Sequence, residues 1–276
     1  MARQYKGQWF MRKAEWDCGD YIEADFYPVF QKPGVRRAKS KPSSAIQQDL
    51  NRRNSERNLI RTIHANFREG DLALSLTFRE LIDLKEAMKR FRAFMRKVRK
   101  AYKKAGEELK YLYIVERGQK SGRIDLHMIV SQGVSRDALE EMWENGYANA
   151  RRLQFTEKGV AALAEYMTKQ GRKKNRERVT YRRWSGSKNL IHPQPVITDA
   201  GTAIRDAEEL AEMIDRRDAE GKAEEMFPGF TLTEAKAMRN KCNRGLYISL
   251  NLCRRELWKG RPFALYTVVD WEDETD

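Results

Sequence analysis

Residues 111–130 decide the fold of this chain, because they predict a β-hairpin. They read Tyr-Leu-Tyr-Ile-Val-Glu-Arg-Gly-Gln-Lys-Ser-Gly-Arg-Ile-Asp-Leu-His-Met-Ile-Val. Two apolar and β-branched runs flank the polar turn at residues 117–122. This pattern is typical of two antiparallel strands joined by a loop somewhat longer than two residues.

The segments around the hairpin extend it into a sheet with helices. Residues 72–78 alternate apolar and polar side chains, which predicts a strand, and from Arg79 to Lys104 the period becomes helical. Further helices are expected near residues 46–66, 135–143, 157–170 and 203–226, and further strands near residues 21–27, 152–155, 246–252 and 263–269. The hairpin requires antiparallel pairing, so the expected class is α+β, an antiparallel β-sheet with flanking helices.

Composition predicts three segments. Residues 1–66 combine a strand, a basic arm rich in Pro and Gly, and a polar Arg-rich helix. Residues 67–195 hold the sheet and all of the candidate chemistry. Residues 196–276 add a helix and strands without recognisable chemistry, which favours dimerisation or partner binding as their role.

Net charge separates the function classes. The chain has 276 residues, with 54 Lys and Arg against 40 Asp and Glu, a formal net charge of +14. Residues 201–276 hold 12 basic and 16 acidic residues, which leaves 42 and 24 in residues 1–200. A basic excess of this kind attracts polyanions, and nucleic acid is the commonest of them.

Other classes are disfavoured by what the sequence lacks. No apolar run approaches the about 18 to 20 residues of a membrane span, and no apolar core follows the N-terminus as in a secretory signal. The three cysteines, Cys18, Cys242 and Cys253, are odd in number and widely spaced. We therefore expect a cytoplasmic protein with no membrane partner, and no disulfide scaffold.

The helix predicted at residues 79–104 carries a basic stripe beside its apolar one. The stripe consists of Lys85, Lys89, Arg92, Arg96 and Lys103. We interpret it from the sequence as a solvated helix face rather than as a DNA contact.

An acid and an imidazole share one face of the second hairpin strand. Side chains two residues apart on a strand point the same way, so Asp125 and His127 lie together. Glu116, near the end of the neighbouring strand, is a third potential ligand for a divalent cation. An Asp-x-His pair on a strand is also compatible with an ion pair or a solvated edge, and the residues alone leave both interpretations open.

Tyr166 and Lys169 are three residues apart in the helix predicted at 157–170, so they share a face. The lysine would hold positive charge beside a phenol whose unperturbed pKa, about 10, makes it a poor nucleophile without help. A core tyrosine beside a surface lysine explains the same pattern.

The order of these pieces resembles the three-motif layout of rolling-circle replication initiators of the HUH endonuclease superfamily. A strand at 72–78, a strand with Asp125-Leu-His127 and a helix with Tyr166-x-x-Lys169 follow one another. Tyr113-Ile-Val-Glu-Arg-Gly118 and Arg183-Trp-Ser-Gly-Ser-Lys188 are similar to phrases of plasmid and phage replication proteins. The resemblance covers about residues 50–190 and implies an HUH-like nicking domain with an RRM-like core.

The resemblance also implies a chemistry: metal-dependent nicking and joining of single-stranded or hairpin origin DNA. Tyr166 would be the nucleophile, assisted by Lys169, and would form a 5′-phosphotyrosine. His127, Asp125 and Glu116 would hold Mg²⁺ or Mn²⁺. Asp125 stands where the family has a histidine, and a carboxylate favours these harder ions. The basic residues expected to bind DNA are Arg172, Lys173, Lys174, Arg182 and Arg183.

Two further expectations concern partners and alternatives. The chain has no Gly-x-x-x-x-Gly-Lys-Ser/Thr loop, so a separate host helicase and polymerase would complete replication. The same chemistry suits a relaxase or a single-strand transposase. A non-catalytic origin-binding protein on the same scaffold is the alternative from another class.

Overall fold

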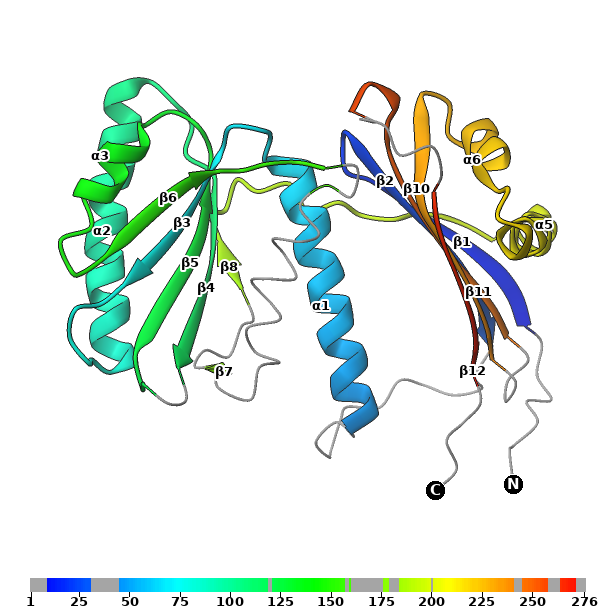
Figure 1. Cartoon of the computed structure of the whole chain (residues 1–276), viewed down its shortest axis with the longest axis horizontal. Coiled ribbons are helices and arrows are strands. Elements are labelled where there is room, and N and C mark those ends of the chain that lie inside the picture. The colour runs from blue at the N-terminus through cyan, green and yellow to red at the C-terminus, as the bar shows by residue number, and fades with distance from the viewer. Residues whose placement is uncertain are drawn as a thin grey trace. The chain divides into compact units, whose positions relative to one another are not determined.

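The computed structural model describes residues 9–30, 45–118, 121–156, 159, 176–178, 184–199, 201–240, 245–257 and 264–271. The chain divides into two compact units (Figure 1). The first consists of Met1–Ile46, Thr156–Gly159 and Pro193–Asp276, and the second of Gln47–Phe155 and Val160–His192. Each unit combines helices with a mainly antiparallel sheet, which confirms the predicted α+β class.

The first unit is a six-stranded sheet in the order β12-β10-β11-β2-β1-β9. Its elements are β1 (Trp9–Asp17), β2 (Tyr21–Phe30), β9 (Val196–Thr198), α5 (Thr202–Arg216), α6 (Glu220–Met226), β10 (Phe230–Asn240), β11 (Gly245–Arg254), the 3₁₀ turn η1 (Arg255–Leu257) and β12 (Leu265–Trp271). Leu210 and Ile214 of α5 pack in one core with Phe26, Ile248 and Leu250 of the sheet. Among the described strands, only β12 runs parallel to its neighbour, β10.

Both ends of the chain build this first sheet. β2 pairs with β11, and β1 pairs with β9, across more than half of the sequence. The sequence-based segments 1–66 and 196–276 separate these strands, because a boundary drawn from local composition carries no information about long-range pairing. α1 (Ala45–Asn66), assigned from sequence to the first segment, has its apolar residues in a core of the second unit.

The second unit holds a sheet in the order β6-β3-β5-β4-β7, with β8 also paired to β4. Its elements after α1 are β3 (Leu72–Thr77), α2 (Leu84–Ala105), β4 (Tyr111–Gly118), β5 (Ile124–Val130), α3 (Arg136–Glu141), β6 (Ala148–Arg152), β7 (Arg176–Arg178) and β8 (Ser185–Gly186). The predicted hairpin is present as β4 and β5, which pair from Tyr111 with Val130 to Arg117 with Ile124.

One face of this sheet is covered by α2 and α3. Phe94 and Val98 of α2 belong to one core with Leu126 and Met128 of β5 and with Leu139 of α3. This face depends on the 3.6-residue period of α2 meeting the two-residue period of the strands.

Both ends of α2 are capped. The Asp83 side chain accepts a hydrogen bond from the Glu86 backbone N–H at 2.7 Å. Gly106 ends the helix in the left-handed conformation, with φ 74°, which a glycine adopts without strain. The predicted helix at 79–104 therefore begins later, at Leu84, where a carboxylate satisfies its first N–H groups.

α1 covers part of the opposite face. Leu59 and Ile63 pack with Leu112, Ile114 and Ile129, which are the apolar residues of β4 and β5 that point away from α2. The sheet is thus flanked by helices on both faces, and its central strand β5 is buried on both sides.

Some predicted elements differ from the observed ones. The single helix expected at 203–226 is two helices, because Arg217 takes the left-handed conformation with φ 63°. The strand expected at 152–155 is β6, which ends at Arg152. β1 and β10 have no predicted counterpart, and the helix expected at 157–170 lies outside the described residues. No described helix is long and apolar enough to cross a bilayer.

Asp71 joins three segments at one end of the second sheet. Its carboxylate accepts hydrogen bonds from the backbone N–H of Arg68 at 2.7 Å and of Gln132 at 2.8 Å, and its carbonyl accepts from Leu153. Asp71 is 6% exposed, and burial raises the pKa of its carboxyl. The side chain thus holds the start of β3 beside the ends of β5 and β6.

We predict that Asp71→Ala lowers the free energy of unfolding by about 1–3 kcal/mol, because two buried N–H groups lose their acceptor. Asp71→Asn should cost less, since the amide oxygen still accepts one of them. Urea unfolding followed by circular dichroism measures both, with the exposed Glu141→Ala as the control. A loss for Asp71→Ala no larger than that of the control would contradict this role.

Candidate functional site

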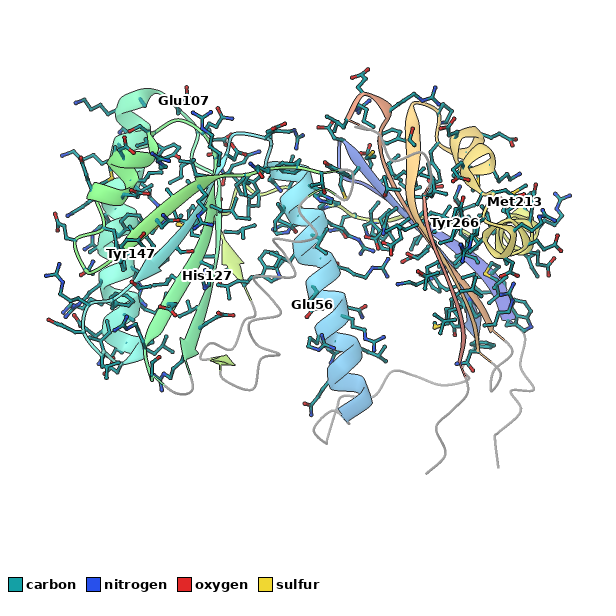
Figure 2. All side chains as sticks on the ribbon, viewed as in Figure 1. Glu56, Glu107, His127, Tyr147, Met213 and Tyr266 are labelled. Carbon is teal, nitrogen blue, oxygen red and sulfur yellow. The ribbon has the colours of Figure 1, made fainter. Side chains whose placement is uncertain are left out.

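The candidate site lies on the face of the second sheet that α2 does not cover. Ile124, Leu126 and Met128 of β5 point into the core under α2, so the alternate residues Asp125 and His127 point to the other face. Figure 2 shows His127 on this sheet. The predicted sharing of one face by Asp125 and His127 thus follows from the observed strand.

Strand register brings two further side chains beside His127. Glu116 of β4 stands directly opposite Asp125, and Ser75 of β3 directly opposite His127. The His127 Nε2 lies 3.6 Å from Glu116 Oε2, and His127 Nδ1 lies 3.4 Å from Ser75 Oγ. Sequence reasoning missed Ser75, although its place in the alternation of residues 72–78 is the signal that identifies its face.

Burial makes this group of side chains electrostatically costly. His127 is 8% exposed and Glu116 5%, so neither is well solvated. Glu116 and Asp125 are carboxylates at directly opposed positions of neighbouring strands, an arrangement that is destabilising when both are charged. A positive charge between them, from a protonated His127 or from a cation, relieves the repulsion.

The donor set fits a divalent cation in part. Two carboxylates and one imidazole are the ligand types that Mg²⁺ and Mn²⁺ accept. The 3.6 Å separation of Glu116 Oε2 and His127 Nε2 is close to that of two ligands of one metal ion, each about 2.0–2.2 Å from it. Within the described ranges, no three His, Cys, Asp or Glu side chains already converge as a metal-binding group.

The remaining predicted site residues lie outside the described residues: Tyr166, Lys169, Arg172, Lys173, Lys174, Arg182 and Arg183. The chain that follows them is informative nonetheless. β7 pairs with β4 so that Arg178 is opposite Glu116 and Arg176 is opposite Gly118. The backbone about ten residues after Tyr166 therefore runs alongside the strand that carries Glu116.

The other two histidines are not part of this site. His64 is buried in the last turn of α1, where its ring centre lies 6.4 Å from that of Phe155. Burial, and then the charge of Arg68, lower the pKa of His64 to about 3. His192 is exposed, with its ring centre 6.0 Å from that of Trp184.

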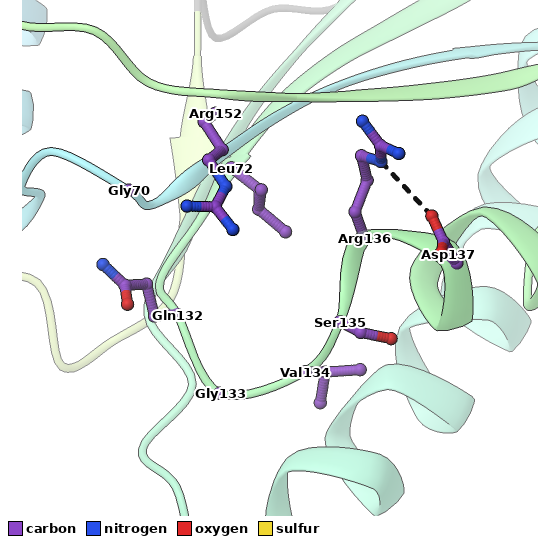
Figure 3. Close-up of a pocket in the computed structure, with 9 residues that line it drawn as sticks. All are labelled: Gly70, Leu72, Gln132, Gly133, Val134, Ser135, Arg136, Asp137 and Arg152. Atoms are coloured by element: carbon purple, nitrogen blue, oxygen red, sulfur yellow. Dashed lines mark hydrogen bonds and ion pairs between the residues drawn. The ribbon is translucent and has the colours of Figure 1, made fainter.

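A pocket of about 610 Å³ lies at the far end of β5 and contains none of the predicted site residues (Figure 3). Its lining includes Gly70, Gln132, Ser135, Arg136, Asp137 and Arg152. Arg136 already pairs with Asp137, Nε to Oδ1 at 3.3 Å. The pocket therefore provides no catalytic group beyond those on the face around His127.

Comparison with known proteins assigns the class of this domain. Residues 71–171 match the family model of the replication-associated protein ORF2. The match begins just before β3 and includes α2, the β4–β5 hairpin, α3, β6 and the positions of Tyr166 and Lys169. It confirms the predicted resemblance and is consistent with a rolling-circle replication initiator. Searches of curated proteins and of solved structures found no match.

The pKa of His64 predicts a pH dependence of stability. Its folded value, about 3, is below the value of about 6.5 expected when unfolded, so the unfolded chain binds this proton more tightly. Stability is fully present above pH 6.5 and should fall by up to about 1.4 kcal/mol per pH unit as the pH drops from 6.5 toward 3.

His64→Gln removes this titration, so its stability should change less between pH 7.5 and 5.0 than that of the wild type. Urea unfolding at each pH measures the difference, with His192→Gln as the matched control at an exposed histidine. Parallel pH profiles for wild type and His64→Gln would show that His64 is not the group responsible.

Proposed function

We propose that this protein starts rolling-circle replication by nicking and rejoining single-stranded origin DNA. The observation that carries the proposal is the family match over residues 71–171, which spans both His127 and Tyr166. The contact of His127 with Glu116 on the uncovered face supports it, because a buried acid–imidazole pair is typical of sites with chemistry to perform.

The cation would be held by Glu116, His127 and Asp125. The first two are at 3.6 Å, and Asp125 stands opposite Glu116 in the register. When bound, a divalent cation would polarise the scissile phosphate and stabilise the charge that develops on it. Ser75, at 3.4 Å from Nδ1, helps to orient the imidazole so that its Nε2 points to Glu116.

Tyr166 would supply the nucleophile. Its phenolic oxygen forms a bond to the phosphorus while the bond to the 3′ oxygen breaks, which leaves a 5′-phosphotyrosine and a 3′-hydroxyl. The phenol gives up its proton and the leaving 3′ oxygen gains one, so the step needs no further reactant than DNA and water. Lys169, one helical turn away in the predicted helix, would favour the phenolate. The reverse transfer rejoins the strand.

Basic residues that follow the tyrosine would hold the substrate. Arg172, Lys173, Lys174, Arg182 and Arg183 bracket β7, whose backbone runs beside Glu116. A strand of DNA bound by them would pass the face that carries His127. The freed 3′-hydroxyl would prime a separate polymerase, with a separate helicase to open the duplex.

We predict that Tyr166→Phe abolishes nicking while DNA binding persists, because only the hydroxyl is removed. A 3′-labelled oligonucleotide incubated with Mn²⁺ should transfer its label to the wild-type protein and not to this variant. Tyr147→Phe makes the same change at an exposed tyrosine of the domain and should retain the adduct.

A 5′ adduct that persists in Tyr166→Phe would move the nucleophile elsewhere, with Tyr181 and Tyr102 as the next residues to test. A wild-type protein that binds the oligonucleotide and never cleaves it, with Mg²⁺ or with Mn²⁺, would favour a non-catalytic origin-binding protein.

Asp125 gives a second test, directed at the metal. Asp125→Ala removes a charged ligand, so nicking should fall at least as far as the about 10–100-fold typical of losing a residue that only supports a ligand. Asp125→His should retain activity and shift the preference from Mg²⁺ toward Mn²⁺, because the ligand set becomes softer. Nicking titrations against each ion measure both effects.

Direct binding of Mn²⁺, followed by electron paramagnetic resonance, separates a lost ligand from a lost substrate contact. Asp137→Ala is the matched control, since Asp137 is an exposed aspartate of the same unit. Identical metal curves for wild type, Asp125→Ala and Asp125→His would refute Asp125 as a ligand.

A further inference from the structure

The outer face of α2 is the most strongly charged surface among the described elements of the second unit. Its 22 residues include ten Lys or Arg and a single acid, Glu86. Nine of the ten basic side chains are exposed: Lys85, Lys89, Arg92, Arg96, Lys97, Arg99, Lys100, Lys103 and Lys104. The structure thus extends the stripe predicted from the sequence to a whole helix face.

Carboxylates neutralise little of this charge. Lys89 pairs with Glu86 at 3.5 Å, and Lys97 pairs with Glu144 at 2.7 Å. Arg99 donates to the Tyr111 hydroxyl, a neutral partner, at 2.8 Å. Within the described part of the chain, no carboxylate lies within ion-pair distance of Lys85, Arg92, Arg96, Arg99, Lys100, Lys103 or Lys104.

Helix physics explains some of these residues and not others. Lys103 and Lys104 lie in the last turn, where cations interact favourably with the helix dipole. Arg92, Arg96 and Lys100 lie in the middle at successive i,i+4 positions, where like charges destabilise a helix by about 0.2–0.5 kcal/mol per pair. Folding of the chain alone gives no reason for this central row, so a partner with negative charge is the remaining explanation.

The face is separate from the candidate site. α2 packs on the face of the sheet formed by Leu126 and Met128, whereas Asp125 and His127 point to the other face. Whatever binds the outer side of α2 is therefore not the strand positioned at His127. It must be a second polyanion, or a second segment of the same one.

We propose that the outer face of α2 binds the phosphate backbone of duplex DNA. The choice of DNA among polyanions rests on the proposed function, and the position of the face takes it beyond the nicking site. α2 is about 33 Å long at 1.5 Å per residue. This length matches about one turn of B-DNA, about 34 Å, so one straight row of cations faces one straight length of backbone.

The composition of the face favours duplex over single-stranded DNA. Proteins that bind single strands without sequence preference stack bases on exposed aromatic side chains. The aromatic residues of α2, namely Phe91, Phe94 and Tyr102, are all buried in the core. An anionic bilayer is disfavoured for a related reason, because the apolar side of α2 is occupied by the sheet and cannot insert.

The test compares two triple variants that each remove three positive charges. Arg92→Gln/Arg96→Gln/Lys100→Gln changes the central row, and Arg205→Gln/Arg216→Gln/Lys236→Gln changes exposed positions of the first unit. Binding to a duplex of unrelated sequence, about two helical turns long, and to a thymidine oligomer of the same length is measured by fluorescence anisotropy at about 50 to 200 mM NaCl.

The central variant should lower the slope of log K against log salt for the duplex by about 2–3 and weaken duplex binding at moderate salt by at least about tenfold. Its binding and nicking of single strands should stay at the wild-type level. The control variant should leave both DNA forms unchanged, and unchanged thermal melting of all three proteins excludes unfolding.

Three outcomes would overturn the proposal: equal duplex affinity and slope for wild type and the central variant, an equal loss in both triple variants, or a loss confined to single strands or to vesicles of anionic lipid. Duplex binding needs no cleavage. A wild-type protein that never nicks therefore refutes the proposed function while this test remains decisive.

Discussion

The second unit depends on the register of β5 between β3 and β4. This central strand is buried on both sides, and its alternate residues serve different purposes. Leu126 and Met128 complete the core under α2, while Asp125 and His127 lie on the opposite face. A slip of one residue would put the acid and the imidazole into the apolar core, so packing against α2 and the geometry of the site are one constraint.

The face that carries the site is itself divided along the strands. Ile129 and Ile114 lie under α1, whereas His127 and Glu116, two residues away on the same strands, form the polar pair. The apolar half anchors a helix and the polar half keeps its donors close at low exposure. A rigid sheet therefore presents the group with little freedom of movement, as catalytic constellations require.

The two faces of this sheet also differ in electrostatic character. The face around His127 brings two carboxylates together, which suits a cation. The opposite side is covered by α2, whose exposed residues are nearly all cationic, which suits phosphate. A sheet that separates these surfaces lets one domain hold a reacting strand and a duplex segment without competition between them.

Local sequence patterns determined the second unit better than the first. The β4–β5 hairpin, the period of α2, the N-terminal boundary of α3 at Ser135 and the shared face of Asp125 and His127 all follow from neighbours within a few residues. The first sheet does not, because β1 and β2 find β9 and β11 in a distant part of the sequence, and composition cannot signal such pairing.

By itself, the sequence determined which residue types this protein offers for chemistry and, through strand alternation, which of them share a face. Only the tertiary structure decided their neighbours: the register of β3 put Ser75 beside His127, that of β4 put Glu116 at 3.6 Å, and the packing of α2 left its cations on the far side of the sheet. The physical reason is that alternation is a property of one strand, whereas register is set by the burial of side chains from several segments at once.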